Sequence, residues 1–155
     1  MESKTLPAGK PKRKHPSPQQ EAAVSILQTA GYLRRFCGSV FEQHDITPQQ
    51  YNVLRILRGA GSQGLPTLDI ADRMIEQTPG ITRLLDRLEA KKLVSRERPL
   101  GDRRQVICYV TKEGLNLLNK LDAPVREKAN EALRVLNEAE TKELIRLLAQ
   151  VRERR

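Results

Sequence analysis

Apolar residues recur with a helical period through most of the chain beyond residue 20. The first stripe lies in residues 21–43 and consists of Ile26, Ala30, Leu33, Cys37 and Val40. Their spacing alternates between four and three residues, which places them on one side of a long helix. A stripe of this length is expected to pack either in the protein's own core or against a partner chain.

A second helix is predicted after "DIT". Thr47 suits the N-cap, and Pro48 suits the first turn because it needs no backbone hydrogen bond there. One face of this helix is apolar, with Tyr51, Leu54 and Leu57. The glycines of "GAGSQG" are expected to end the helix near Arg58.

Two shorter helices follow. The first is expected to begin at Thr67 as N-cap and to bury Leu68, Ala71 and Met74. In the second, Thr78 is the expected N-cap and Pro79 is expected in the first turn. Its apolar face consists of Ile81, Leu84, Leu85 and Leu88, and its opposite face of Gly80, Thr82, Arg83, Asp86 and Arg87. Two short helices joined by a tight turn indicate a helix-turn-helix.

A hairpin is predicted directly after these helices. Residues 93–98 and 105–110 have the character of strands, and "PLGDRRQ" lies at the tip between them. Beyond the hairpin, a long helix capped by Thr111 extends to Leu136, with a kink expected near Lys120 because of Pro124. A last helix opens with Asn137 and Glu140 as a capping box. The fold class is therefore mostly α, a winged helix-turn-helix with a small β-hairpin wing.

The chain divides into a tail and one domain. Residues 1–20 contain four prolines and five basic residues against one glutamate, which predicts a disordered basic tail. The alternative is an arm that follows a nucleic-acid backbone. Within residues 21–155, residues 47–110 form the winged helix-turn-helix, and 21–43 and 111–152 form dimerisation helices.

The terminal helices present more apolar surface than one small winged helix can cover, which favours a homodimer. The residues expected at the dimer interface are Ile26, Leu33, Val40, Leu144, Leu147, Leu148 and Val151.

Charge and composition narrow the function. The chain carries 28 basic and 19 acidic residues, a net charge of +9, which favours a polyanionic partner. Cys37 and Cys108 lack metal-site spacing, and the two histidines stand in no catalytic constellation. We therefore expect no enzyme activity, metal or cofactor. The sequence also predicts no membrane span and a cytoplasmic protein.

The second short helix carries groups suited to DNA. Helices that enter the major groove read bases with their N-terminal residues. Here these residues are Thr78, Pro79, Gly80, Thr82 and Arg83. Arg83 can pair with a guanine through two hydrogen bonds, and Arg87, one turn further, is expected at the backbone. The alternative is that both arginines belong to a solvated helix face and pair with Asp86 or Glu89.

The hairpin tip offers a second contact. Arginine is attracted into narrow, A·T-rich minor grooves, where the negative potential is concentrated. We expect Arg104 to enter the minor groove, Arg103 to contact phosphates, and Asp102 to orient Arg104.

The segment "TPGITRLLDRLEAKKLVSRERPLGDRRQVICYVTKEG" resembles the MarR family of bacterial regulators. The matching motifs are "ITRLLDRLE", "DRR" and "VTKEG", and the resemblance covers roughly residues 21–152. It implies a homodimeric repressor or activator that binds pseudo-palindromic double-stranded DNA, in many members released by a small, frequently phenolic, effector. By match to the motifs, Thr82, Arg83, Arg87 and Arg104 contact DNA, and Asp102 supports Arg104.

The resemblance also places an effector pocket between the dimer helices and the winged domain. Tyr32, Arg35 and Tyr51 are candidate lining residues, with ordinary core or surface positions as the alternative. Some members of the family sense oxidants through a cysteine. Cys37 lies well inside its predicted helix, where burial would make the thiol unreactive, so we do not expect redox sensing. A protein-interaction or architectural module without ligand control is the competing function.

Overall fold

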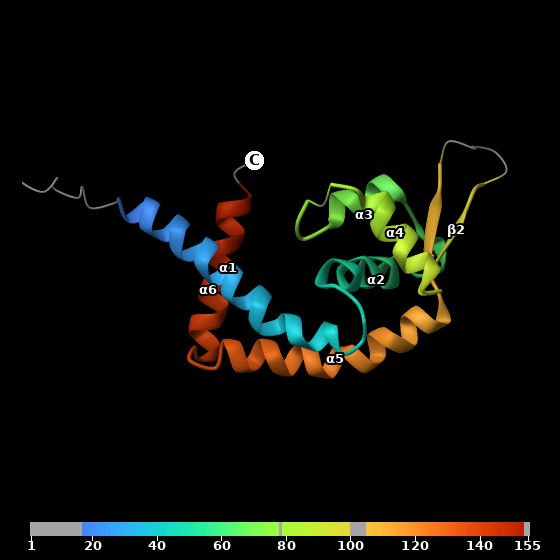
Figure 1. The fold of residues 1–155 in the computed structure, drawn as a ribbon. Helices are drawn as coiled ribbons and strands as arrows, with labels where there is room; N and C mark the ends of the chain where they lie inside the picture. The colour runs from blue at the N-terminus through green and yellow to red at the C-terminus, as the bar shows by residue number, and fades with distance from the viewer. Residues whose placement is uncertain (1–16, 78, 100–104, 154–155) are drawn as a thin grey trace, which may run out of the picture. The chain divides into compact units, whose positions relative to one another are not determined.

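The computed structural model describes residues 17–77, 79–99 and 105–153, and the chain falls into two units, Met1–Tyr32 and Leu33–Arg155. The helices are α1 (Pro18–Glu42), α2 (Pro48–Ala60), α3 (Thr67–Arg73), α4 (Ile81–Ala90), α5 (Lys112–Ala132) and α6 (Glu138–Arg152), with a short 3₁₀ helix, η1 (Gly61–Gln63). The strands are β1 (Leu65–Pro66), β2 (Val94–Glu97) and β3 (Ile107–Val110) (Figure 1). The predicted class, mostly α with a small antiparallel sheet, is confirmed.

Side-chain caps define where several helices begin. At α2, the Thr47 hydroxyl accepts a hydrogen bond from the Gln50 amide at 3.2 Å, and Gln50 Oε1 accepts one from the Thr47 amide at 2.9 Å. Asn137 and Glu140 form the same reciprocal box at α6, as the sequence predicted. Ser17 and Gln20 do so at α1, which therefore begins at Pro18, earlier than the expected residue 21.

The prediction for α3 was wrong in two respects. Thr67 lies inside the helix and makes no cap, because β1 runs directly into α3 and the Thr67 amide donates to the Val106 carbonyl at 3.3 Å. Leu68 is 76 % exposed, and Ile70 is fully buried instead. The pairing of β1 therefore sets the rotation of α3, and Ile70 takes the core position expected for Leu68.

The core of the Leu33–Arg155 unit is built around α2. This helix lies between α5 on one side and α3 and α4 on the other (Figure 1). The side chains with no exposed surface come from each of these helices and from β3, and they are Val53, Leu54, Leu57, Ile70, Leu85, Leu88, Cys108, Leu118 and Leu121. Burial also raises the pKa of the Cys108 thiol. Because Leu85 and Leu88 insert into this core, the orientation of α4 is fixed.

The sheet has the order β1-β3-β2 with antiparallel pairing throughout. Val94 pairs with Val110 in the predicted hairpin, whereas the pairing of Leu65 in β1 with Cys108 was not predicted. Thr111 directly follows β3 and caps α5, its hydroxyl accepting a hydrogen bond from the Gly114 amide at 3.1 Å. A Cβ on Gly114 would lie 2.4 Å from the Leu93 carbonyl oxygen, so this close approach requires glycine.

Helix α5 includes Pro124 and ends at Ala132, short of the expected Leu136. An ion pair joins it to α2, with Arg58 Nη1 and Nη2 at 2.8 and 3.1 Å from the two carboxylate oxygens of Asp122. Hydrogen bonding to this guanidinium lowers the pKa of Asp122. Across the described ranges, no helix combines the length and apolar character needed to cross a membrane.

Candidate nucleic-acid interface

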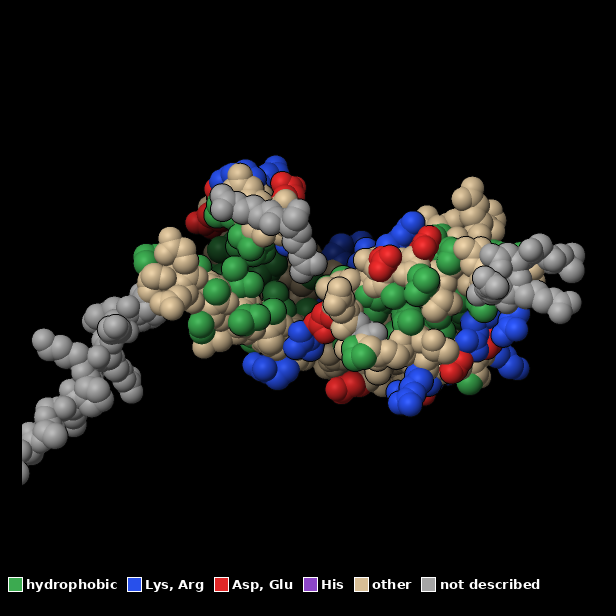
Figure 2. Space-filling model, turned by 90° about the horizontal axis from the view of Figure 1, so that it is seen from above, with side chains coloured by type: hydrophobic (Ala, Val, Ile, Leu, Met, Phe, Trp, Pro, Cys, Tyr) green, Lys and Arg blue, Asp and Glu red, His purple; other side chains and the backbone are tan. Residues whose placement is uncertain are grey.

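Helix α4 presents two different faces. Leu85 and Leu88 have no exposed surface, and Ile81 and Leu84 are half-buried beside them. On the other side, the exposed residues are Thr82, Arg83, Asp86 and Arg87, the polar face that the sequence predicted. Figure 2 shows one face of the molecule, on which Lys and Arg side chains lie at several separate places. The apolar face thus anchors α4 while the polar face meets solvent.

The start of α4 differs from the prediction. Gly80 is the N-cap residue with φ 91°, a left-handed conformation that favours glycine, and the helix begins at Ile81. Pro79 therefore lies in the preceding turn rather than in the first turn, and Thr78 lies outside the described residues. Pro79 and Gly80 are exposed, and a Cβ on Gly80 would meet no atom within 4 Å. The backbone at this end of α4 is thus open to a ligand.

The two acidic residues of α4 interact with the wing. Arg96 on β2 donates from Nη2 to Asp86 Oδ1 at 2.7 Å and from Nε to Glu89 Oε2 at 2.9 Å. Within residues 79–99, neither Arg83 nor Arg87 has an acidic partner. The expected pairing of these arginines with Asp86 or Glu89 is therefore wrong, although both lie on a solvated face as that alternative supposed, and both guanidinium groups remain available to an anion.

The wing is described only along its strands. Strand β2 ends at Glu97 and β3 begins at Ile107, and Arg98 just beyond β2 is exposed. Asp102, Arg103 and Arg104 lie outside the described residues. The minor-groove contact by Arg104, its orientation by Asp102, and the phosphate contact by Arg103 stay predictions.

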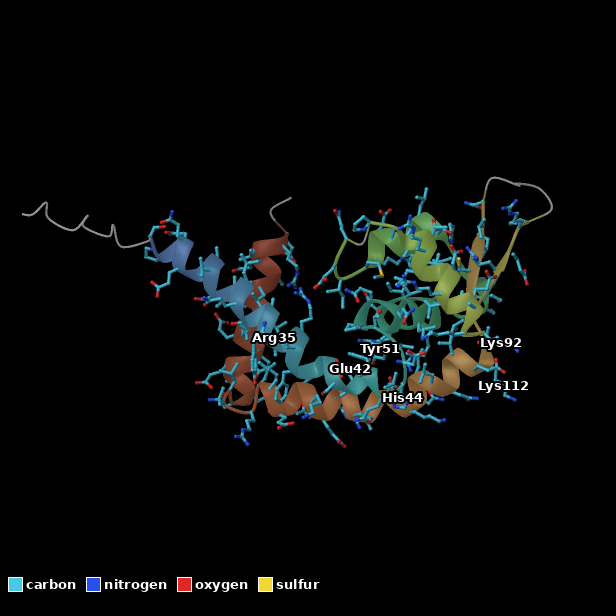
Figure 3. All side chains as sticks on the ribbon, viewed as in Figure 1. Arg35, Glu42, His44, Tyr51, Lys92 and Lys112 are labelled. Carbon is cyan, nitrogen blue, oxygen red and sulfur yellow. The ribbon has the colours of Figure 1, made fainter. Side chains whose placement is uncertain are left out.

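Arg35 and Tyr51, two of the three candidate effector-binding residues, lie far from each other in the structure (Figure 3). Tyr51 is 7 % exposed, its ring centroid is 4.8 Å from that of Phe41, and burial raises its pKa. Arg35 is exposed on α1, and Figure 3 shows it well separated from Tyr51 on α2. Tyr32 belongs to the other unit and is 45 % exposed. Tyr51 is thus a core residue.

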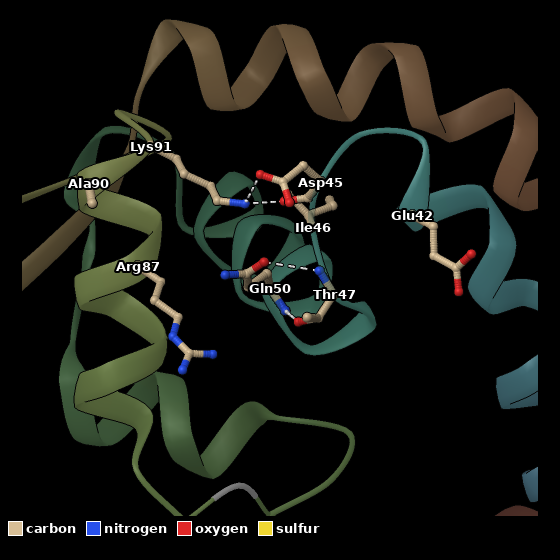
Figure 4. Close-up of a pocket in the computed structure, with 8 residues that line it drawn as sticks. All are labelled: Glu42, Asp45, Ile46, Thr47, Gln50, Arg87, Ala90 and Lys91. Atoms are coloured by element: carbon tan, nitrogen blue, oxygen red, sulfur yellow. Dashed lines mark hydrogen bonds and ion pairs between the residues drawn. The ribbon is translucent and has the colours of Figure 1, made fainter.

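A cavity that the sequence did not reveal lies between the α1–α2 turn, the start of α2, and α4 (Figure 4). Its volume is about 590 Å³, and its lining residues are Glu42, Asp45, Ile46, Thr47, Gln50, Arg87, Ala90 and Lys91. Lys91 Nζ lies 2.8 Å from Asp45 Oδ2 across one side of it. Arg87 thus belongs both to the polar face of α4 and to this cavity.

Most residues expected at the dimer interface are accessible. The exposed fractions are 41 % for Ile26, 36 % for Leu144, 46 % for Leu147 and 66 % for Val151. Leu33 and Leu148 are half-buried. Val40 is 9 % exposed within the core cluster of its own chain, so its side chain is already used in that core.

Comparisons with known proteins identify the family. The family of transcriptional regulators described as SarA/Rot matches residues 35–121. The chain is 31 % identical over 104 residues to the homoprotocatechuate degradative operon repressor of Escherichia coli, covering 67 % of this chain and 69 % of that protein. A MarR transcription factor from Planctomyces limnophilus is 39 % identical, with a TM-score of 0.69 over 88 % of this chain and 99 % of that one. The chain belongs to the MarR family.

Membership of the MarR family makes the chain a DNA-binding transcriptional regulator, as the sequence motifs predicted. The fold also matches a mutant MarR from E. coli complexed with operator DNA, with a TM-score of 0.76 and 24 % identity over 84 % of this chain and 93 % of that one. The helix-turn-helix predicted from the sequence corresponds to α3 and α4, and the predicted hairpin to β2 and β3.

Proposed function

We propose that the chain is a homodimeric repressor that binds a pseudo-palindromic operator and is released from it by a small ligand. The observation that carries this proposal is the polar face of α4. Its two arginines are exposed and have no acidic partner among the described residues, while Leu85 and Leu88 fix the helix in the core. A rigid helix with free guanidinium groups is suited to the major groove.

In the proposed complex, the N-terminal part of α4 enters the major groove. Arg83 and Thr82 contact base edges, Arg87 contacts the backbone, and the open turn at Pro79 and Gly80 allows close approach of a phosphate. Thr78, which precedes Pro79 in the sequence, is the remaining predicted DNA contact of this segment. Arg104 of the wing enters the neighbouring minor groove with Asp102 as its orienting partner, and Arg103 binds phosphates.

Selection of bound sequences from a random duplex pool tests the DNA-binding proposal. We expect an inverted repeat whose half-sites are about one helical turn, or about 10 base pairs, apart. The logarithm of the affinity for this duplex should fall linearly with the logarithm of salt concentration, because bound Lys and Arg displace counterions. Salt-sensitive binding without any sequence motif would instead support the architectural or protein-interaction function.

Ligand control is proposed at the cavity between the α1–α2 turn and α4. A small phenolic molecule bound there would contact Arg87, which the proposed complex uses on DNA, and would lie against Thr47 and Gln50. Arg35 lines a neighbouring cavity that shares Glu42 and Thr47 with it. A ligand acts only if it favours the unbound arrangement. Titrating the selected duplex complex with simple phenols should therefore release DNA, and no release would remove this part of the proposal.

Dimerisation is proposed through the apolar stripe of α6 together with that of α1. Leu147→Glu would place a carboxylate in the middle of the α6 stripe, and burying it unpaired in an interface is costly. We expect this variant to be monomeric and to bind the inverted repeat at least tenfold more weakly, since about half of the contacts are lost. Sedimentation velocity measures the first effect and a gel-shift titration the second.

Lys142→Gln is the matched control because it changes the charge of α6 by the same amount at a position away from the stripe. Its side chain is 73 % exposed and pairs with Glu138, one turn earlier. It should stay dimeric. A Leu147→Glu variant that remained dimeric would exclude this face of α6 as the interface.

A further inference from the structure

The side chain of Arg96 joins the wing to α4. It lies in β2, where it pairs in register with Cys108 of β3, and its side chain is 23 % exposed. Its guanidinium bridges Asp86 and Glu89, which lie one turn apart on α4. The planar guanidinium can hold two carboxylates at once in a fixed direction, which a lysine ammonium cannot do as well.

Asp86 lies on the same exposed face of α4 as Arg83, three residues further along the helix, a spacing at which the two side chains can pair. Released from Arg96, its carboxylate could pair with Arg83 and would repel nearby phosphates. The observed bridge instead directs both carboxylates to the wing.

We propose that Arg96 is a positioning residue for DNA recognition, which keeps Arg83 unpaired by holding Asp86 and which sets the angle of the wing to α4 through its bridge to Asp86 and Glu89. This inference rests on the proposed DNA-binding mode of α4. It assigns to Arg96 no direct contact with DNA, since its Nε and Nη2 donors are already used by the two carboxylates.

The test is a binding cycle on the selected duplex. Arg96→Gln is expected to weaken binding roughly tenfold, within the usual range of coupling between contacting charged residues. In a chain that already carries Asp86→Asn and Glu89→Gln, the same change should weaken binding less than twofold, because no carboxylate remains to be held. A direct phosphate contact by Arg96 would give equal losses in both backgrounds and would overturn the proposal.

Two further variants separate positioning from charge and from stability. Arg98→Gln removes the same charge from an exposed arginine close to Arg96, and its loss should be clearly smaller. Arg96→Lys keeps the charge but not the two-carboxylate bridge, so it should recover only part of the affinity; full recovery contradicts the bridging role. Half-exposed ion pairs contribute little to stability, so the thermal midpoint should move by only a few degrees.

The cycle distinguishes failure of this inference from failure of the proposed function. If the parent protein selects no duplex, the DNA-binding mode itself is wrong, and the Arg96 inference falls with it. If the parent selects an inverted repeat and Arg96→Gln binds it as the parent does, only the positioning role is lost.

Discussion

Replacing Arg83 with alanine is expected to weaken binding to the selected operator by roughly 10- to 100-fold, corresponding to about 1–3 kcal/mol for a bidentate contact with guanine. The same variant should tolerate other bases at one position of each half-site. Its free energy of unfolding should hardly change, because the side chain is exposed and has no acidic partner within residues 79–99. Fluorescence anisotropy at fixed salt, with each base substituted in turn, measures both effects.

Arg146→Ala is the control for a general loss of positive charge. Arg146 lies on α6, away from the recognition face of α4. Its side chain is 54 % exposed and forms an ion pair with Glu143. We expect its operator affinity to stay within about twofold of the parent, as is usual for charges not in contact with the ligand. If Arg83→Ala kept both the affinity and the base preference of the parent, Arg83 would not read DNA.

Replacing Leu85 with alanine is expected to lower the free energy of unfolding by about 2–5 kcal/mol, because it removes a buried side chain and leaves a cavity between α4 and the core. Leu85 has no exposed surface. Since domains of this size have total stabilities of about 5–15 kcal/mol, the loss is a large fraction. Urea denaturation followed by circular dichroism measures it.

Leu68→Ala provides the matched control, because it makes the same chemical change on the neighbouring helix α3. Leu68 is 76 % exposed, and its replacement should change the stability by no more than about 0.5 kcal/mol. Equal losses at the two positions would mean that α4 is not anchored through Leu85.

The parts of the fold that the sequence predicted correctly depend on local signals. Thr47, Thr111 and Asn137 each bind an amide within their own first helical turn, so a short stretch of sequence contains the whole interaction. The two faces of α4 were predicted for the same reason, since a helical period places Leu85 and Leu88 together.

The errors arise where distant segments meet. Strand β1 has two residues and exists only because Leu65 and Pro66 pair with β3, so neither its presence nor the resulting rotation of α3 could be seen in "LPTLDIADRM".

In the candidate site, too, the features set by local sequence were predicted and those set by contacts between distant segments were not. The exposure of Arg83 and Arg87 followed from helical periodicity, but their lack of partners did not. Local pairing was the simplest expectation because Arg83 and Asp86 are three residues apart and Asp86 and Glu89 are the two acidic residues of α4. Their actual partner, Arg96, lies across a turn on another element, and only the packing of β2 against α4 brings it within reach.

The pairing of β1 with β3 has a consequence for the order of folding. Leu65 precedes the whole helix-turn-helix and its partner Cys108 follows it, so pairing them closes a long loop. The loss of chain entropy on closing this loop is larger than that on forming the β2–β3 hairpin. On the ribosome, a chain that has released α2, α3 and α4 still lacks the central strand of the sheet. A nascent regulator therefore acquires its wing, and with it a complete DNA-reading surface, only after the last strand has emerged.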